Sequence, residues 1–558
     1  MQLSPKPFPP FCERREPIKP QLRVIAGARR DPSIHAVAAS TFFIMAATLG
    51  STLLGFAREV VNARYYGTRW EMDTFLAAAT IPTILFGVFN GALVSALVPV
   101  FSEYLTNDDE ASAWRLCNTV INVLAVLLVL CAGIGWLLAP WFVPLIAHGF
   151  QEPQMIVAVR MTRWLMPSIV AVSLSGVLSA MLNAYHKFRW ASLTGIAMNV
   201  VTVGCVIFLT HHMGIYAVVL GTALGLFAQL LVQLPPFIGL HRYRLEIDLH
   251  HPGLKRIWEM LGPIMVGSAA GQLALFFDRF FASTLPPGSM AGMNYATKLV
   301  NFPQQIFAAA IATVIFPLLA QHFARDNRRA VARNVNLGLR LVMFIAIPSV
   351  VALAVLAHPI VQTLFERGHF TAASVALTQE MLPYAAFGLV ALAANVVLTR
   401  CCFACQESAW PVAISVFTVM LNILLSLLWL PTLGARGLLM ANSSSQSVQM
   451  VMLLALVSRL LHGFAWRELL RAFLKIATAA TAMLLALNWI AALGVHPEAS
   501  LLSRFWFLFG QIAIGGTVFV AVAMALKAEE LHLAIQLIVA KFERGTVGPY
   551  ENREAPIA

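Results

Sequence analysis

Long apolar stretches follow one another along almost the whole chain, and short polar loops separate them. A helix needs about 20 mainly apolar residues to cross the hydrocarbon core of a membrane. The stretches are too long and too continuously apolar for a β-barrel, whose strands are short and alternate in polarity. The pattern therefore predicts an all-α polytopic membrane protein with fourteen transmembrane helices. They are expected at 36–57, 73–102, 114–138, 157–183, 190–211, 214–240, 257–284, 291–320, 336–358, 376–402, 410–431, 435–459, 470–493 and 503–526.

The segment 56–99 is repeated at 277–317. The offset is 221 residues at the arginine and at the following proline, and 218 at the last proline. In an apolar chain, two matching halves are typical of a transporter whose pathway lies between the repeats. The matching positions are Phe56-Ala57-Arg58 and Phe277-Asp278-Arg279, Gly67 and Gly288, Met72-Asp73 and Met293-Asn294, Pro82 and Pro303, and Val98-Pro99 and Phe316-Pro317.

Composition and charge agree with a membrane protein. Hydrophobic residues make up 59% of the chain and charged residues 11%, and the mean hydropathy is +0.76. The net charge of +12 lies mainly in short loops beside the helices, which argues against a nucleic-acid partner. The alternate connections 139–156, 212–216, 285–292 and 494–502 contain no Lys or Arg. Basic loops of a membrane protein face the cytoplasm, so these alternate connections are expected on the opposite side. Both termini are then expected in the cytoplasm.

The sequence shows no recognisable enzyme chemistry. It contains no phosphate-binding loop, no dinucleotide fingerprint and no nucleophile or zinc-protease motif. Cys401, Cys402 and Cys405 form a C-x-x-C without a second pair or a nearby histidine, so packing is a better interpretation than metal binding. We therefore predict a non-enzymatic transporter without a cofactor, coupled to an ion gradient, the membrane potential or the flux of its substrate.

Charged residues inside the membrane are costly and are candidates for function. Arg58 and Arg279 occupy matching places in the two repeats, so symmetry directs both toward the interface between the halves. Lys298 shares a polar helix stripe with Asn301. A cavity lined by such cations would select anions, since guanidinium and ammonium groups bind phosphate. Pro82 and Pro303 are predicted hinges, because proline frees a backbone carbonyl and kinks a helix.

Three segments resemble the MurJ (MviN) family of lipid II flippases. They are GFAREVVNARYYGTRWEMDTFLAAATIPTILFGVFNGALVSALVPVFSEY, NAYHKFRWASLTGIAMNV and MNYATKLVNFPQQIFAAAIATVIFPLLAQ. The resemblance implies the fold of the MOP exporter superfamily, with two six-helix, MATE-like lobes around a central cavity and two further helices that form a lipid groove. It implies a bacterial inner-membrane protein that moves undecaprenyl-pyrophosphate-linked peptidoglycan precursor to the periplasmic leaflet for cell wall synthesis.

The implied domains follow from this fold. They are a disordered basic tail (1–34), an N-lobe (35–245), a C-lobe (246–462), the groove helices (463–527) and a cytoplasmic amphipathic tail (528–558).

The resemblance also assigns individual residues. Asp73 falls where the family keeps an outer-gate aspartate, and Ala63 is assigned to the same gate. The cavity is expected to include Ser51 and Thr52 with the cations above. A monovalent cation site between the seventh, eleventh and twelfth helices is expected to use Asp278, Asn422 and Asn442. The chain departs from the family's charged pattern at Thr52, Phe86, Asn90, Thr297, Lys298 and Asn301.

Three functional alternatives remain at this stage. The first is a lipid II flippase, and the second is a flippase for another polyprenyl-linked oligosaccharide, which the missing family charges favour. The third is a membrane scaffold without transport or an exporter of small molecules. An exporter of cationic drugs would need acids in its cavity, whereas the candidate charges here are mainly basic. We expect a monomer, because one chain forms the whole cavity.

Overall fold

The computed structural model describes residues 34–107, 109–185, 187–238, 243–325, 327–461, 463–493 and 500–531. These residues form helices and connecting loops, without a strand among them. The expected tail 1–34, apart from its last residue, and most of the tail 528–558 lie outside the described residues. The helices are α1 (Ile34–Tyr66), α2 (Trp70–Ala78), α3 (Thr80–Thr106), α4 (Glu110–Ile146), α5 (Glu152–Leu165), α6 (Ser168–Ala184), α7 (Phe188–Ser192), α8 (Thr194–Met213), α9 (Tyr216–Leu231), the 3-10 helix η1 (Pro235–Phe237), α10 (Pro252–Ser283), α11 (Ser289–Ala324), α12 (Arg328–Val355), α13 (Ala357–Phe365), α14 (Ala372–Phe387), α15 (Leu389–Ala404), α16 (Ala409–Leu433), α17 (Ala435–Leu460), α18 (Trp466–Ala492) and α19 (Leu501–Ala525).

Each of the fourteen predicted stretches overlaps at least one of these helices. Among the described residues, eleven helical segments are long and apolar enough to cross a membrane. The chain is therefore a multi-pass membrane protein. The other three predicted stretches coincide with α10, α11 and α17, which are helical but lie outside that set of eleven. The exact number of fourteen spans stays a prediction.

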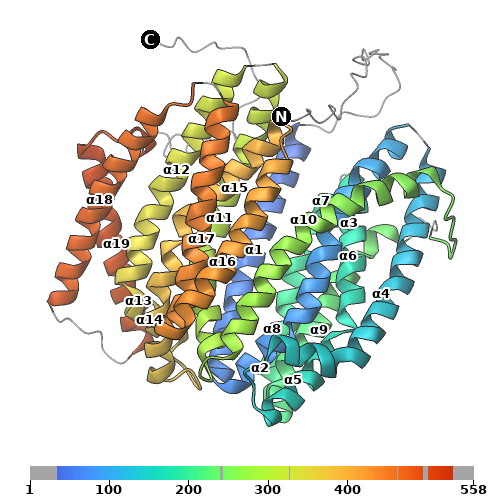
Figure 1. The fold of residues 1–558 in the computed structure, drawn as a ribbon, viewed down its shortest axis with the longest axis horizontal. Coiled ribbons are helices and arrows are strands. Elements are labelled where there is room, and N and C mark those ends of the chain that lie inside the picture. Colours follow the sequence, from blue (N-terminus) through green and yellow to red (C-terminus); the bar gives the residue numbers. More distant parts are fainter. Residues whose placement is uncertain are drawn as a thin grey trace, which may run out of the picture.

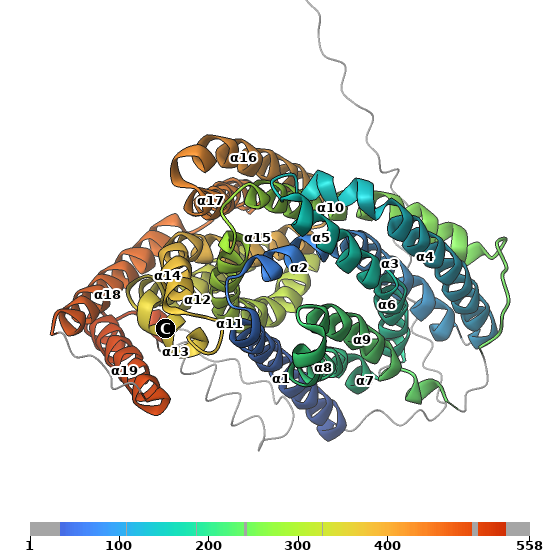
Figure 2. The same cartoon turned by 90° about the horizontal axis from the view of Figure 1, so that it is seen from below.

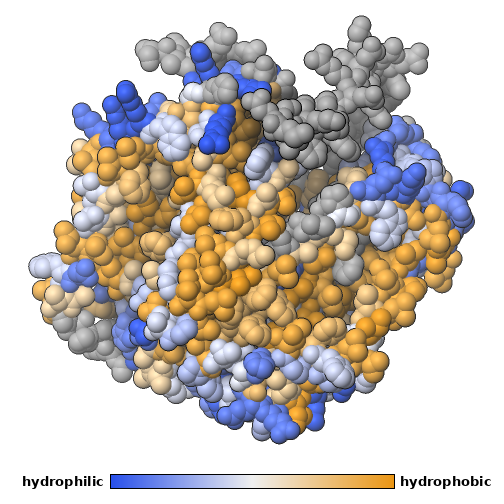
Figure 3. Space-filling model, viewed as in Figure 1, coloured by the Kyte–Doolittle hydropathy of each residue, from blue (hydrophilic) through white to orange (hydrophobic). Residues whose placement is uncertain are grey.

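The surface has the polarity of a protein that lies in a bilayer. In Figure 3 a broad band of apolar side chains lies between polar rims at the two ends of the molecule. Large tryptophans are exposed near helix ends, where their amphipathic rings suit the boundary between lipid and water. Examples are Trp258 and Trp466 near the starts of α10 and α18, and Trp141 and Trp489 near the ends of α4 and α18.

The sequence repeat reappears in the packing of the helices. α1 packs along α8, and its repeat counterpart α10 packs along α16. The hairpin α8–α9 has a counterpart in α16–α17, and the contact of α2 with α5 has one in the contact of α11 with α14. Figure 2 shows α8 and α9 across the molecule from α16 and α17, with α1 beside α11, while α10 of the second half reaches across to pack along α3 of the first. The two halves therefore share an architecture as well as a sequence pattern.

The last two helices form a hairpin at one edge of the molecule (Figures 1 and 2). α18 packs against α12, and Phe519 of α19 lies against Phe344 of α12 with ring centroids 5.2 Å apart. At the upper end, Arg340 of α12 pairs with Glu530 at 2.6 Å and with Glu529 at 2.7 Å, just beyond α19. The hairpin is thus attached to the second half of the chain.

Candidate functional site

The two halves of the chain meet at the lower end of the molecule in Figure 1, where α2, α5, α13 and α14 lie. We call the loops there the loop junction, which comprises residues 64–73, 147–151, 283–291 and 366–374. Asp73 is its most buried acid, 4% exposed. Its carboxylate accepts the backbone N–H of Ala291 at 2.7 Å and that of Gly288 at 2.5 Å. One side chain of the first half therefore holds the start of α11 in the second half.

Two glycines bring the halves into backbone contact at this junction. Gly368 has φ +58°, and a Cβ there would lie 2.3 Å from the carbonyl oxygen of Arg64. A Cβ on Gly149 would lie 2.3 Å from the carbonyl oxygen of Ser283. The first contact joins the loop after α13 to α1, and the second joins the loop after α4 to α10. Because these glycines are 219 residues apart, close to the repeat offset, the junction is itself pseudo-symmetric.

Further hydrogen bonds reinforce the junction. The N–H of His369 donates to the carbonyl of Arg64 at 2.8 Å, and the hydroxyl of Thr68 donates to Ser374 at 2.7 Å. The hydroxyl of the fully buried Tyr295 donates to the carbonyl of Gly67 at 3.3 Å. This end of the molecule is closed by direct contacts between the two halves.

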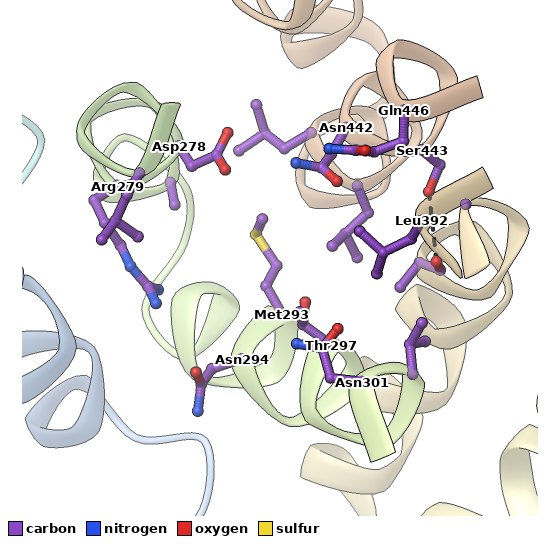
Figure 4. A pocket seen from close by; sticks show the side chains of 17 residues that line it. Asp278, Arg279, Met293, Asn294, Thr297, Asn301, Leu392, Asn442, Ser443 and Gln446 are labelled. Carbon is purple, nitrogen blue, oxygen red and sulfur yellow. Dashed lines mark hydrogen bonds between the residues drawn. The ribbon is translucent and has the colours of Figure 1, made fainter. Parts of the chain in front are cut away.

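A pocket lies beside the junction, between α10, α11, α15 and α17 (Figure 4). Asp278 and Asn442 face one another across it, whereas Arg279 points toward the side of Asn294. Arg279 thus brings a cation into a pocket whose other polar groups are mostly neutral, and Asp278 is the acid beside it. The polar lining residues are Asp278, Arg279, Asn294, Thr297, Asn301, Asn442, Ser443 and Gln446.

Arg58 and Lys298 lie outside that lining and belong to a second charged group around Glu59. Arg58 donates to the Glu59 carboxylate at 3.0 Å, and the carboxylate is 5% exposed. Lys298 lies within electrostatic range of Glu59, and Asn294 hydrogen-bonds the same carboxylate. Asn294 therefore connects the Glu59 group on α1 with the pocket that Arg279 lines.

Sequence reasoning missed Glu59. The candidate charges inside the membrane are predicted to be mainly cations, although Glu59 directly follows Arg58 in the FARE motif. A buried carboxylate needs a charged or hydrogen-bonding partner, so Glu59 explains how the charge of Arg58 is balanced within α1. Together the two groups place two arginines, one lysine and two acids on facing helices of the two halves. In such a set, an anionic ligand can replace the carboxylates as the partner of the cations.

The predicted cation-site residues lie close to one another. Asn422 on α16 donates to Asp278 at 3.1 Å, and Asn442 lines the same pocket as Asp278. The carbonyl oxygen of the Asn422 side chain and the hydroxyl of Ser426 are buried and have no hydrogen-bond partner among the described residues. No group of three His, Cys, Asp or Glu side chains suited to a metal occurs among the described residues. The groups here are amides, a hydroxyl and one carboxylate, whose oxygens are the ligands that hard cations prefer.

The other predicted residues lie elsewhere. Ser51 packs toward Gly195 of α8, and its carbonyl accepts from Asn199, whereas Thr52 donates to Thr48 within α1. Neither is among the pocket residues. Ala63 is fully buried, one turn before Gly67 at the junction.

The predicted hinges differ from each other. Pro82 lies in the first turn of α3, which begins at Thr80 after a break at Ala79, whereas α11 runs through Pro303 without a break. The side chain of Asn90 lies outside the described part of the chain.

Comparison with known proteins identifies relatives over most of the chain. The family model described as lipid II flippase MurJ matches residues 62–509. The lipid II flippase MurJ of Burkholderia cenocepacia is 30% identical over 404 residues, which are 70% of this chain and 78% of that protein. The probable lipid II flippase MurJ of Vibrio cholerae serotype O1 is 29% identical over 505 residues, 87% of this chain and 95% of that protein.

Solved structures show the same fold. A lipid II flippase MurJ in an inward closed conformation has a TM-score of 0.75 at 23% identity, covering 88% of this chain and 100% of that one. A multidrug resistance MATE family transporter of the MOP superfamily, in an inward-facing conformation, has a TM-score of 0.65 at 15% identity. It covers 74% of this chain and 96% of its own. The predicted MATE-like architecture is confirmed.

Proposed function

We propose that this chain, which belongs to the lipid II flippase MurJ family, moves lipid II from the cytoplasmic to the periplasmic leaflet of the bacterial inner membrane by alternating access. The family match over residues 62–509 and the polar pocket that Arg279 and Asp278 line in the second half support this function. The observation that carries the mechanism is the loop junction, where Asp73 of one half holds the start of α11 in the other.

The proposed topology follows from the loop charges. Both termini lie in the cytoplasm, so the loop junction, which carries the lysine- and arginine-free connections 139–156 and 285–292, lies at the periplasmic face. The junction is then a closed outer gate, with Asp73 and Ala63 within it. The pocket is reached from the cytoplasmic side, and the hairpin α18–α19 forms the groove for the lipid tail. The chain acts as a monomer and catalyses no covalent reaction.

Each charged group has a proposed task. Arg279, Arg58 and Lys298 bind the pyrophosphate, while Glu59 and Asp278 neutralise these cations when the pocket is free of substrate. Exchange of an internal carboxylate for a pyrophosphate oxygen lets the substrate enter without leaving a buried charge unpaired. The polar side chain of Asn301 lies in the same pocket and hydrogen-bonds the headgroup. Pro82 and Pro303 act as the hinges of the two halves.

A monovalent cation is the proposed coupling ion, together with the membrane potential. Asp278, Asn422 and Asn442 would hold it, and the unpartnered oxygens of Asn422 and Ser426 support this assignment. Such an ion supplies positive charge next to Arg279 and stabilises the arrangement of α10, α16 and α17. Replacing Asp278 with Asn should remove the dependence of transport on sodium or potassium. The same variant should lose the thermal stabilisation that the cation gives the purified protein.

The test of the function is complementation in a bacterium depleted of its own lipid II flippase. Rescue by the native chain, and loss of rescue with Arg58→Ala at equal membrane abundance, would support lipid II transport and the role of the arginine. Arg436→Ala is the matched control, because Arg436 forms an exposed ion pair with Glu380 outside the pocket. Failure of the native chain, with the protein present in the membrane, would favour another polyprenyl-linked oligosaccharide, as the neutral Thr297 and Asn301 in the pocket suggest.

A further inference from the structure

One ion pair joins the C-terminal hairpin to the loop junction. Arg504, in the first turn of α19, donates to the carboxylate of Glu366 at 2.5 Å. The two side chains are 21% and 23% exposed, so the pair is shielded from water on most sides. Glu366 directly follows the last residue of α13. The pair therefore connects the start of one groove helix to the loop between α13 and α14.

The residues on both sides of Glu366 contact the first half of the chain. The ring of Phe365 is fully buried and lies 6.1 Å from that of Phe56 on α1. Two residues after Glu366, Gly368 meets the carbonyl of Arg64, which also accepts the N–H of His369. Glu366 is thus the anchored point of a short segment that closes the junction.

The hairpin itself is fixed to the body of the second half at its other end. Arg340, 12% exposed, holds Glu529 and Glu530 directly after α19. The helix between the two anchors is continuous from Leu501 to Ala525. A displacement of the hairpin is therefore transmitted along a rigid helix to Glu366, rather than being absorbed by a flexible loop.

We propose that Arg504 and Glu366 are positioning residues of the outer gate, which couple the α18–α19 hairpin to its closure. The pair holds the segment 366–370 against α1 while the gate is closed. A hydrocarbon chain that moves the hairpin outward would pull Glu366 away from α1 and loosen the contacts at Gly368 and His369. This inference rests on the proposed function, in which the junction is the periplasmic gate.

The experiment measures access to the junction with a cysteine reporter. Ser374→Cys is nearly isosteric, and position 374 is 5% exposed at a hydrogen bond between the halves. Spheroplasts that carry this reporter are treated with a membrane-impermeant maleimide, and labelling is followed over time against the parent chain without the added cysteine. Loss of a partly buried ion pair changes such an equilibrium about fivefold, so Arg504→Ala should label about five times faster.

The charge-swapped variant separates positioning from general damage. Arg504→Glu combined with Glu366→Arg restores the attraction and should return labelling to the native rate, whereas either reversal alone should accelerate it. Arg436→Ala breaks an exposed ion pair of 2.8 Å with Glu380, and neither residue belongs to the junction loops; it is the matched control and should leave the rate unchanged. Labelling that stays slow in Arg504→Ala, or that the swap does not correct, overturns the coupling.

Asp73→Asn distinguishes the proposed role of the Arg504–Glu366 pair from the proposal that the loop junction is the gate. If Asp73→Asn accelerates labelling and Arg504→Ala does not, the gate stands and the role of the ion pair is wrong. If neither variant accelerates labelling, the junction is not the gate and both proposals fall. Acceleration by both, with correction by the charge swap, supports both. None of these readouts depends on the identity of the transported lipid.

Discussion

Asp73 caps the N-terminus of α11 by accepting its free backbone N–H groups, although the N-cap residue of a helix usually does this. The N-cap here is Gly288, with φ +93° and no side chain that could accept a hydrogen bond. Asp73, 215 residues earlier, supplies the carboxylate and accepts two N–H groups of the first turn. A carboxylate at a helix N-terminus also interacts favourably with the helix dipole. The closure of the loop junction and the stability of the helix start are therefore linked through one residue.

Asp73→Asn should weaken this closure without unfolding the protein. The amide keeps one acceptor but turns an NH₂ group toward a backbone N–H, so one of two charge-assisted hydrogen bonds is lost. We expect rescue of the depleted bacterium to fall at least tenfold, which corresponds to about 1.4 kcal/mol. Binding of lipid II to the purified protein should change little. Full rescue by Asp73→Asn at normal abundance would exclude a gating role.

Arg58→Ala should abolish transport, and Glu59 allows the cause to be identified. Removing the arginine leaves the 5% exposed carboxylate of Glu59 without its closest partner, which costs roughly 3 kcal/mol. The double variant Arg58→Ala/Glu59→Gln removes that penalty. We expect its thermal stability to recover while rescue stays absent, because the pyrophosphate still lacks its arginine. Recovery of both would show that Arg58 serves the fold alone.

The sequence predicted the candidate residues of each half better than it predicted which side chains of the other helices they contact. Arg58, Arg279 and Asp73 could be identified from the repeat and from the family resemblance. Glu59 and the contact of Asn294 with it could not, because they depend on how α1 faces α11. Ser51 was expected in the cavity, but the rotation of α1 turns it toward α8. A repeat fixes which positions correspond, and only packing fixes where each side chain points.

Pro82 explains why one predicted span consists of two helices. Proline lacks the N–H that would bond to the carbonyl four residues earlier, here that of Ala78. That carbonyl instead accepts the buried hydroxyl of Thr162 on α5 at 3.2 Å. The break between α2 and α3 is thus satisfied by a neighbouring helix, as membrane helices require. The apolar pattern predicted the span 73–102 but could not show where it divides.

Pro82→Ala should straighten this element. The new N–H can bond to Ala78, which joins α2 to α3 and releases Thr162. We expect transport to fall several-fold while the thermal stability stays the same or rises by up to about 1 kcal/mol. Pro140→Ala is the control, since Pro140 also lies inside a helix but in α4, away from the pocket and the junction. Unchanged transport by Pro82→Ala would remove the hinge assignment.

The ion pair of Arg340 with Glu529, which attaches the C-terminal hairpin to α12, makes a pH-dependent contribution to the stability of the protein. The hydrogen bond and the positive charge from Arg340 hold the pKa of Glu529 below its usual range. A carboxylate with a lowered pKa stabilises the folded state above its ordinary pKa, and this stabilisation is lost as the pH falls through the lowered value.

Glu529→Gln should therefore lower the melting temperature slightly at pH 7, because the side chain of Glu529 is 72% exposed. The difference from the native chain should shrink as the pH falls below the ordinary pKa of a glutamate and disappear once the pH is below the lowered pKa. Melting curves between neutral and acidic pH would check this. Arg340→Ala should cost far more, about 3 kcal/mol, because it leaves Glu530 buried and unpaired. Equal losses in the two variants would contradict the burial argument.

The molecule is closed at the loop junction, and the contacts that close it follow the symmetry of the sequence repeat. Gly149 meets Ser283 and Gly368 meets Arg64, so each half contributes one loop backbone and receives one. A pseudo-symmetric closure of this kind lets the same contacts open together when the halves rotate. The sequence repeat predicted a path between the halves. It did not predict which end is closed, because that depends on the conformation and not on the pattern.

A disulfide across the junction would test whether the halves must separate for transport. The hydroxyl oxygens of Thr68 and Ser374 are 2.7 Å apart, so Thr68→Cys and Ser374→Cys place two sulfurs within bonding reach. Alternating access requires this closure to open in every cycle. The oxidised double variant should therefore lose rescue, and a reductant should restore it, while each single cysteine variant stays active. A scaffold that does not transport would give no rescue in either redox state, because growth of the depleted bacterium requires transport. Rescue that is indifferent to the crosslink, with the disulfide verified in the membrane, would show that transport does not require this junction to open and would argue against its role as a gate.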